Sequence, residues 1–268
     1  METVTRPVHP ALQSCLAEPM VAYDIVLPVD AVHVGVPSTA ATVIIAVEEP
    51  LDVGWLHEPN RSTARWCSIS GLHLRPALIH THGLQRGIHL AVTPIGCRAL
   101  FGAPIGSVAT HTVDMDDLPR GLTCDEHEGI ASRTSWTDRL AAAEAMLLTR
   151  LNRWAGDPTV TAAWRLLGSG LPVAEVAAEI GCSRRHLRNR VRAEFGLTPK
   201  EISLLARFEN AQRLVASGAS LTEAASSCGY ADQSHLSREW KRFVGGSPKA
   251  RTEDFPNLQD LALIADHD

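Results

Sequence analysis

The pattern of apolar and polar residues divides the chain into two parts. Up to about residue 125, apolar residues occur in short runs rich in β-branched side chains, and Gly, Pro, Asn and Ser separate these runs. This pattern is typical of short β-strands, which we predict at 41–49, 51–57, 65–70, 76–82 and 85–93. Several short strands at this spacing favour a small β-barrel or a sandwich-like domain.

Helical signals follow these strands. Thr93 and Pro94 form an N-cap and a first helical position, and Gly102 closes the predicted helix. From about 132 to 154 the period is again helical, and one face carries Trp136, Leu140, Ala143, Leu147, Leu151 and Trp154. Packing of this face on its own domain is the preferred interpretation, and a partner-helix surface through Trp136 and Leu147 is the alternative.

After Pro158 the chain is predicted to be helical throughout. Two segments repeat one pattern, VAEVAAEIGCSRRHLRNRVRAEFGLTP and LTEAASSCGYADQSHLSREWKRFVGGSP. Each has a short alanine-containing helix, a turn at Gly181 or Gly229, and a longer basic helix. This is the pattern of a helix-turn-helix. Two copies in tandem, bridged by a helix over 199–217, predict a double helix-turn-helix domain.

Each of the two basic helices also carries an apolar stripe. Apolar residues at i, i+4 and i+7 or i+8 lie on one side of a helix, and here they are Leu187, Val191 and Phe195 in the first copy and Leu236, Trp240 and Phe243 in the second. The stripes predict that one face of each helix packs on its own domain, which leaves the basic face outside.

These patterns predict an α+β protein with a mostly-β N-terminal domain and an all-α C-terminal domain. The predicted parts are an N-terminal domain at 1–154, a linker at 155–158 that Pro158 ends, a helical domain at 159–252 and an acidic tail at 253–268.

The net charge of the chain is −5, but the charges are unevenly distributed along it. Residues 158–251 contain 14 Lys and Arg against 8 Asp and Glu, so this segment carries +6 and the remainder carries −11. Charge asymmetry of this kind indicates a basic binding module joined to an acidic domain.

Other classes of protein find little support in the sequence. No apolar run is long enough to cross a bilayer, and the first residues lack the pattern of a secretion signal. The six cysteines are scattered, with no C-x-x-C pair, which suits reduced thiols. We therefore expect a cytoplasmic protein without membrane contact.

At GYADQSHLSREWKRFVGGSP the chain resembles the AraC/XylS family of bacterial transcription regulators. The similarity covers about 159–251 and includes the aromatic residue after the turn glycine and the Asp-Gln-Ser-His cap region. The sequence differs from the family pattern at Val191, Leu236 and Ala250. These are core positions, so they affect packing rather than DNA contact.

The resemblance implies two recognition helices in successive major grooves, one helical turn or about 34 Å apart. Matched to the family pattern, Arg185, Arg188 and Asn189 would contact base edges. The implied DNA-binding residues are Arg184, Arg185, Arg188, Asn189, Arg192, Gln233, Ser234, His235, Ser237, Arg238 and Lys241. Arginine can donate two hydrogen bonds to guanine and asparagine can pair with adenine, so the first helix predicts a half-site that contains guanine.

The N-terminal domain allows three interpretations. The first is a domain that binds a small-molecule effector or a second subunit, as the resemblance implies, with RNA polymerase as a further partner of the regulator. The second is a cupin-like metal-dependent enzyme, suggested by the H-x-H at His80 and His82 with the nearby His73 and His89. The third is a redox-sensing regulator that uses Cys67, Cys97 or Cys124.

The first interpretation is preferred, and no enzyme activity is predicted. The closing ligands of a metal site are not at a suitable spacing, and the sequence contains neither a G-x-S-x-G elbow nor a P-loop. No catalytic residue, metal ligand or cofactor is therefore assigned, and the residues that would hold an effector are not identified.

Overall fold

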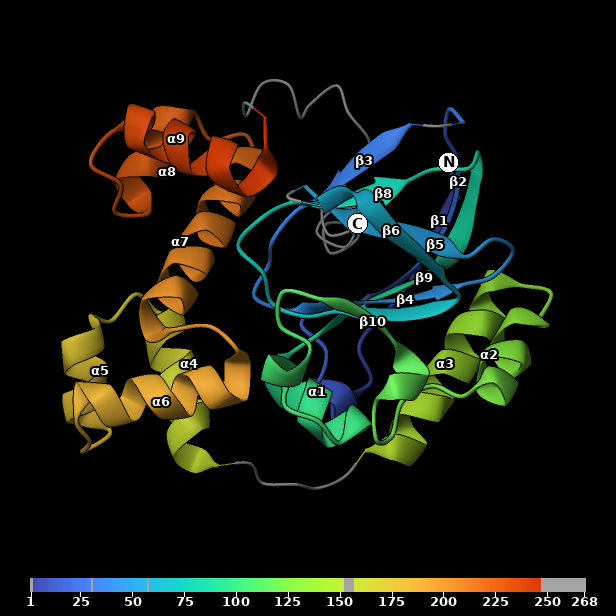
Figure 1. Ribbon diagram of the computed structural model, residues 1–268, viewed down its shortest axis with the longest axis horizontal. Coiled ribbons are helices and arrows are strands. Elements are labelled where there is room, and N and C mark those ends of the chain that lie inside the picture. Colours follow the sequence, from blue (N-terminus) through green and yellow to red (C-terminus); the bar gives the residue numbers. More distant parts are fainter. Residues whose placement is uncertain (1, 30, 57, 152–156, 247–268) are drawn as a thin grey trace.

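The computed structural model describes residues 2–29, 31–56, 58–151 and 157–246. The β-rich part and the C-terminal helices lie side by side (Figure 1). The predicted tail at 253–268, the end of the helix at 152–154, and Ala155, Gly156 and Ala250 lie outside the described residues.

Within the described ranges, ten strands form two antiparallel sheets. The larger sheet contains, in spatial order, β1 (Glu2–Arg6), β2 (Met20–Val26), β9 (Leu84–Val92), β4 (Ala41–Ala46), β7 (Cys67–Ser70) and β10 (Thr112–Asp114). The smaller contains β3 (Val32–Gly35), β8 (Ala77–His80), β5 (Leu51–Trp55) and β6 (Glu58–Arg65). The two sheets remain separate, so the sandwich is confirmed and a closed barrel is wrong.

Alternation along β9 shows how the larger sheet is buried on both faces. Ile88 and Leu90 point into the main hydrophobic core, and His89 lies between them on the opposite face, toward the smaller sheet. A strand buried on both sides cannot show the simple alternation of apolar and polar residues. This explains why the second half of β9, IHLAV, is apolar except for His89.

Helices cover the outer face of the larger sheet. They are η1 (Pro10–Leu12), α1 (Pro94–Phe101), η2 (Ile105–Ser107), η3 (Met115–Asp117), α2 (Cys124–Ala131) and α3 (Trp136–Arg150). The N-cap at Thr93 and the left-handed closing residue Gly102 are confirmed. The helix predicted at about 132–154 begins later, because Ser135 is its N-cap. Trp136 and Leu147 are buried in their own domain, so the partner-helix alternative is wrong.

Glu126 in the first turn of α2 ties that helix to α3. The Arg150 guanidinium donates to Glu126 Oε1 at 2.6 Å and to Oε2 at 2.5 Å, and the Thr123 backbone N–H donates at 2.9 Å. The guanidinium bonds are the main cause that lowers the pKa of Glu126 to about 2, from an ordinary value of 4.5.

This ion pair predicts a pH dependence of stability. Because the pKa of Glu126 is lower in the folded state, its contribution is complete above about pH 4.5 and is lost as the pH falls toward 2. Glu126→Gln should therefore lower the melting temperature at pH 7 and flatten its decrease between pH 5 and pH 3, measured by circular dichroism. Glu128→Gln, at an exposed position of the same helix, is the control. Parallel curves for wild type and Glu126→Gln would contradict the prediction.

The described residues of the C-terminal part form six helices, which agrees with the prediction that this part is helical throughout. They are α4 (Pro158–Gly168), α5 (Val173–Glu179), α6 (Arg184–Phe195), α7 (Pro199–Ala216), α8 (Leu221–Ser227) and α9 (Gln233–Val244). The capping box of Thr198 and Glu201 at the start of α7 is confirmed. In the predicted linker, Asp157 is the N-cap of α4 and Pro158 its first residue. None of the helices in the described ranges is long and apolar enough to cross a bilayer.

Candidate nucleic-acid interface

The first helix-turn-helix unit consists of α5 and α6. Gly181 occupies a left-handed conformation with φ of 74°, which permits the sharp turn between the helices. Ser183 then accepts the backbone N–H of His186 at 3.2 Å and caps α6. Leu187, Val191 and Phe195 are buried, so the predicted packing face is confirmed.

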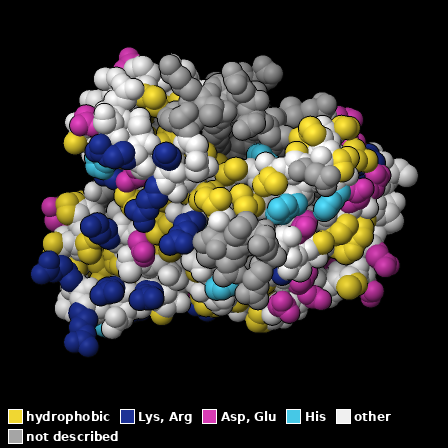
Figure 2. Space-filling view, turned by 45° about the horizontal axis from the view of Figure 1, so that its top comes forward, with side chains coloured by type: hydrophobic (Ala, Val, Ile, Leu, Met, Phe, Trp, Pro, Cys, Tyr) yellow, Lys and Arg dark blue, Asp and Glu magenta, His cyan; other side chains and the backbone are white. Residues whose placement is uncertain are grey.

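The opposite face of α6 is exposed and basic. Arg184, Arg185, Arg188, Asn189 and Arg192 are all exposed. None of the five forms an ion pair with the rest of the described chain, whereas the neighbouring Arg190 pairs with Asp157. Figure 2 shows the Lys and Arg side chains gathered at the left, over the C-terminal helices. An unpaired basic face of this kind suits contact with phosphates and base edges.

The second unit, α8 and α9, repeats this arrangement. Asp232 accepts the His235 backbone N–H at 2.7 Å and caps α9. The stripe of Leu236, Trp240 and Phe243 is buried, as predicted. It packs on Phe208 of α7, whose ring centroid lies 5.4 Å from that of Trp240 and 4.5 Å from that of Phe243.

The predicted DNA-binding residues of α9 differ in their exposure. Gln233, Ser234, Arg238 and Lys241 are exposed, and His235 and Ser237 are half-buried. His235 packs edge-on against Tyr230, and its Nδ1 accepts the Ala231 N–H at 3.4 Å. Gln233 Oε1 accepts a hydrogen bond from Thr222 Oγ1 at 3.1 Å. His235 therefore helps to shape the turn, and the freely exposed side chains are the better placed for DNA.

A buried polar cluster joins α9 to α7. The Arg207 guanidinium donates to both carboxylate oxygens of Glu239, at 3.1 and 2.9 Å, and lies 4.2 Å from the centroid of the Tyr230 ring. Tyr230 donates its hydroxyl to Glu239 at 2.6 Å. Burial and this carboxylate raise the pKa of Tyr230. This cluster was not predicted, although Glu239 lies beside the apolar stripe of α9, where a charged residue indicates a buried ion pair.

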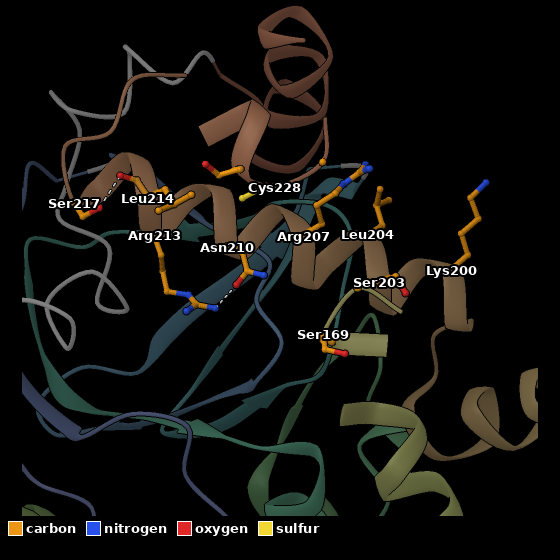
Figure 3. A pocket seen from close by; sticks show the side chains of 14 residues that line it. Ser169, Lys200, Ser203, Leu204, Arg207, Asn210, Arg213, Leu214, Ser217 and Cys228 are labelled. Carbon is orange, nitrogen blue, oxygen red and sulfur yellow. Dashed lines mark hydrogen bonds between the residues drawn. The ribbon is translucent and has the colours of Figure 1, made fainter. Parts of the chain in front are cut away.

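Between the two units, α7 borders a groove of about 840 Å³. Figure 3 shows Lys200, Arg207 and Arg213 along this helix, with Ser169 at the end of α4 and Cys228 at the end of α8 on either side. Arg213 donates to Asn210 Oδ1 at 2.5 Å. Since one continuous helix with basic residues connects the units, it sets the separation of α6 and α9.

The N-terminal domain contacts the first unit and the connecting helix α7. The Arg98 guanidinium of α1 donates to both carboxylate oxygens of Glu194 at the end of α6, at 2.8 and 2.5 Å. Thr39 Oγ1 donates to Glu209 of α7 at 2.6 Å. A Cβ on Gly106 would lie 2.7 Å from the backbone nitrogen of Gly196, so the two backbones approach closely. The position of the recognition helices is thus coupled to the β-sandwich.

The histidines of the proposed metal site are not brought together. His73 and His89 line a cavity between the two sheets. His80 is the last residue of β8, His82 Nε2 lies 3.8 Å from Asp52 Oδ2, and neither histidine is among the described residues that line this cavity. Among the described residues, no group of three or more His, Cys, Asp or Glu side chains is arranged to hold a metal ion. The H-x-H alternative therefore finds no support in the geometry.

The cysteines of the redox alternative differ in environment. Cys67 and Cys97 are buried, and burial is the main cause that raises the pKa of each thiol to about 12. Thiols with such a pKa are poor nucleophiles because the thiolate is the reactive form. Cys124 is exposed. Burial thus argues against sensing through the first two.

Comparisons with known proteins agree with the two-unit geometry. A family model described as a helix-turn-helix domain matches residues 176–253. No curated protein matches the chain. Apo ToxT K231A from Vibrio cholerae strain SCE256 is similar over 92% of this chain and 98% of its own, with 11% identity and a TM-score of 0.57. Unsaturated fatty acid bound wild-type ToxT from the same strain is similar over 87% and 93%, with 11% identity and a TM-score of 0.52.

At these identities the similarity to ToxT concerns the fold. It extends over both domains, which places the β-sandwich beside the helical domain in both proteins. With a helix-turn-helix domain of the AraC type within residues 176–253 and the two-domain fold of ToxT, this chain is a DNA-binding transcription regulator.

Proposed function

We propose that the chain binds promoter DNA with α6 and α9 in successive major grooves on one face of the duplex. The observation that supports this most is the pair of capped helices whose apolar faces are buried and whose basic faces are exposed. Helix α7 separates them, and insertion in adjacent major grooves requires a separation of about 34 Å.

The side chains divide by the kind of contact that they can make. Arg185, Arg188 and Asn189 of α6 are assigned to base edges, because their groups can form paired hydrogen bonds with guanine or adenine. Arg184 and Arg192 are assigned to phosphates. On α9, Gln233 and Arg238 are assigned to bases, and Ser234 and Lys241 to phosphates. His235 and Ser237 lie at the edge of this surface because they are half-buried.

The N-terminal domain is proposed to bind a small-molecule effector in the cavity between its sheets. The fatty acid bound form of ToxT is a protein of the same fold with a bound small molecule. In this chain, the cavity is lined by residues of both sheets, including Tyr23, Ile44, Val53, His73 and His89. Apolar walls with a few polar groups are typical of ligand sites.

Further partners are proposed from the family resemblance. A regulator that binds promoter DNA acts where the chromosome and RNA polymerase are, so we propose a cytoplasmic protein that contacts RNA polymerase and pairs with a second copy of itself. No enzymatic step is proposed, since neither the histidines nor the thiols form a reactive cluster in the described chain.

The DNA proposal is tested by selecting genomic fragments on the full-length protein. The expected result is a shared motif with two elements one helical turn apart, one of them containing guanine. Binding should weaken as salt is raised, because phosphate contacts release counterions. Enrichment of fragments without any shared motif would show that the basic faces bind only through charge, and would refute the assignment of base contacts.

A further inference from the structure

Among the described residues that line the cavity between the sheets, none is Asp, Glu, Lys or Arg. The polar groups of these residues are hydroxyls, one amide and three imidazoles, and the amide and imidazoles belong to Gln85, His33, His73 and His89. A carboxylate placed here would lack a cationic partner, and burying an unpaired charge is strongly unfavourable. The lining therefore favours an uncharged ligand.

His89 carries an unsatisfied polar atom in this lining. It is 2% exposed, and its Nδ1 is buried without a hydrogen-bond partner in the described chain. Buried polar groups are nearly always hydrogen-bonded, and an unpaired one carries a cost of desolvation. A ligand with a hydrogen-bonding group would remove this cost.

His73 offers a second hydrogen-bonding atom. Its Nδ1 donates to the Arg75 carbonyl at 2.6 Å, which leaves Nε2 of the neutral ring as an acceptor. Burial lowers the pKa of both His73 and His89 to about 4, so both rings are neutral at pH 7. Neutral rings cannot supply the positive charge that a carboxylate would need.

The size of the cavity limits the ligand. Its volume is about 70 Å³, several times the roughly 10–15 Å³ that one buried water needs on the same measure. A compact molecule with a few non-hydrogen atoms fits such a space, whereas an extended acyl chain does not.

Two segments of the cavity wall also contact the DNA-binding helices. In the first, Val36 lines the cavity and packs in the core of α7 and α9, and Thr39 nearby bonds to Glu209. In the second, Leu74 packs on the same core, next to His73 in the wall. A ligand that displaces these segments would therefore move the second recognition helix.

We propose that this cavity binds a compact uncharged molecule with an apolar body and an amide or hydroxyl group, and that its occupancy changes operator affinity through the segments at Val36–Thr39 and His73–Leu74. This inference rests on the proposed effector role of the N-terminal domain. It differs from that role in naming the chemical class of the ligand.

The test compares two molecules of the same shape, isobutyramide and isobutyrate, on the full-length protein at pH 7.5. We expect a saturable increase in melting temperature with isobutyramide and none with isobutyrate at equal concentration. His89→Phe keeps the ring volume and should weaken isobutyramide binding about tenfold, as expected for one lost hydrogen bond. His89→Gln keeps a hydrogen-bond donor and an acceptor, so its affinity for isobutyramide should lie within about threefold of that of the wild type.

The second readout is the affinity for a selected operator fragment, measured by fluorescence anisotropy. Isobutyramide should change the affinity for this operator about fivefold or more, which is the lower end of the usual range of allosteric coupling. Thr39→Ala should reduce this change without altering isobutyramide binding. Three results would overturn the proposal. They are isobutyrate binding as tightly as isobutyramide or more tightly, isobutyramide binding that is unchanged in His89→Phe, and no binding of either molecule. Isobutyramide binding by a protein that selects no DNA motif would refute the DNA proposal and leave the ligand class standing.

Discussion

Replacing Phe208 with alanine is expected to lower the free energy of unfolding of the C-terminal helices by about 3–5 kcal/mol. Phe208 is fully buried in the middle of α7 and packs against both Trp240 and Phe243 of α9. Its removal opens a cavity between two helices that are already held by the Arg207–Glu239 pair, so the site cannot collapse easily. We expect the second recognition helix to lose its fixed orientation.

The effect can be measured by urea denaturation followed by circular dichroism. Phe208→Leu, which retains most of the apolar volume, is the matched control and should lose less than half as much stability. Binding to the second element of the operator should weaken in Phe208→Ala and the first element should remain bound. A loss below about 1 kcal/mol would mean that Phe208 is not central to this core.

Substitution of one exposed arginine on each recognition helix is expected to change DNA specificity at one element only. Arg188→Ala should weaken binding by about 1–3 kcal/mol, or about 5- to 150-fold, and remove the preference for guanine in the first element. Arg238→Ala should do the same in the second element. The reason is that each side chain is exposed on a different helix and neither forms an ion pair within the described chain.

The measurement is a quantitative binding-site selection with each variant at a fixed salt concentration. Arg165→Ala is the matched control, because Arg165 is an exposed arginine of the same domain that lies on α4, outside both recognition helices. Its motif should match that of wild type. A uniform loss of affinity for all sequences in Arg188→Ala would assign this residue to a phosphate instead of a base.

Much of the helical domain could be predicted because its signals are local. The apolar stripe of α9 repeats at the helical period. Ser183 and Thr198 are N-cap residues that mark the starts of α6 and α7. The turn glycines Gly181 and Gly229 adopt the left-handed conformation that the motif requires. The exposure of α6 and its arginines followed from the same periodicity. The specific DNA contacts of these arginines remain predictions.

The β-domain was predicted less completely. The central strand β4 and the second half of β9 are mostly apolar and were predicted, whereas the segment of β6, EPNRSTAR, has no apolar pattern. It becomes a strand because β5 offers a free edge to pair with. Such pairing depends on the backbone of another segment, so the hydrophobic pattern of β6 itself contains no sign of it.

The sequence by itself determined the helix-turn-helix units, because caps, turns and helical periodicity act between residues that are near one another in the chain. Only the tertiary structure decided how they are held. The Arg98–Glu194 bond joins residues far apart in the sequence, and the cavity of His73 and His89 forms where two sheets meet. Neither follows from local pattern, because sheet order and domain packing depend on the burial of many distant side chains at once.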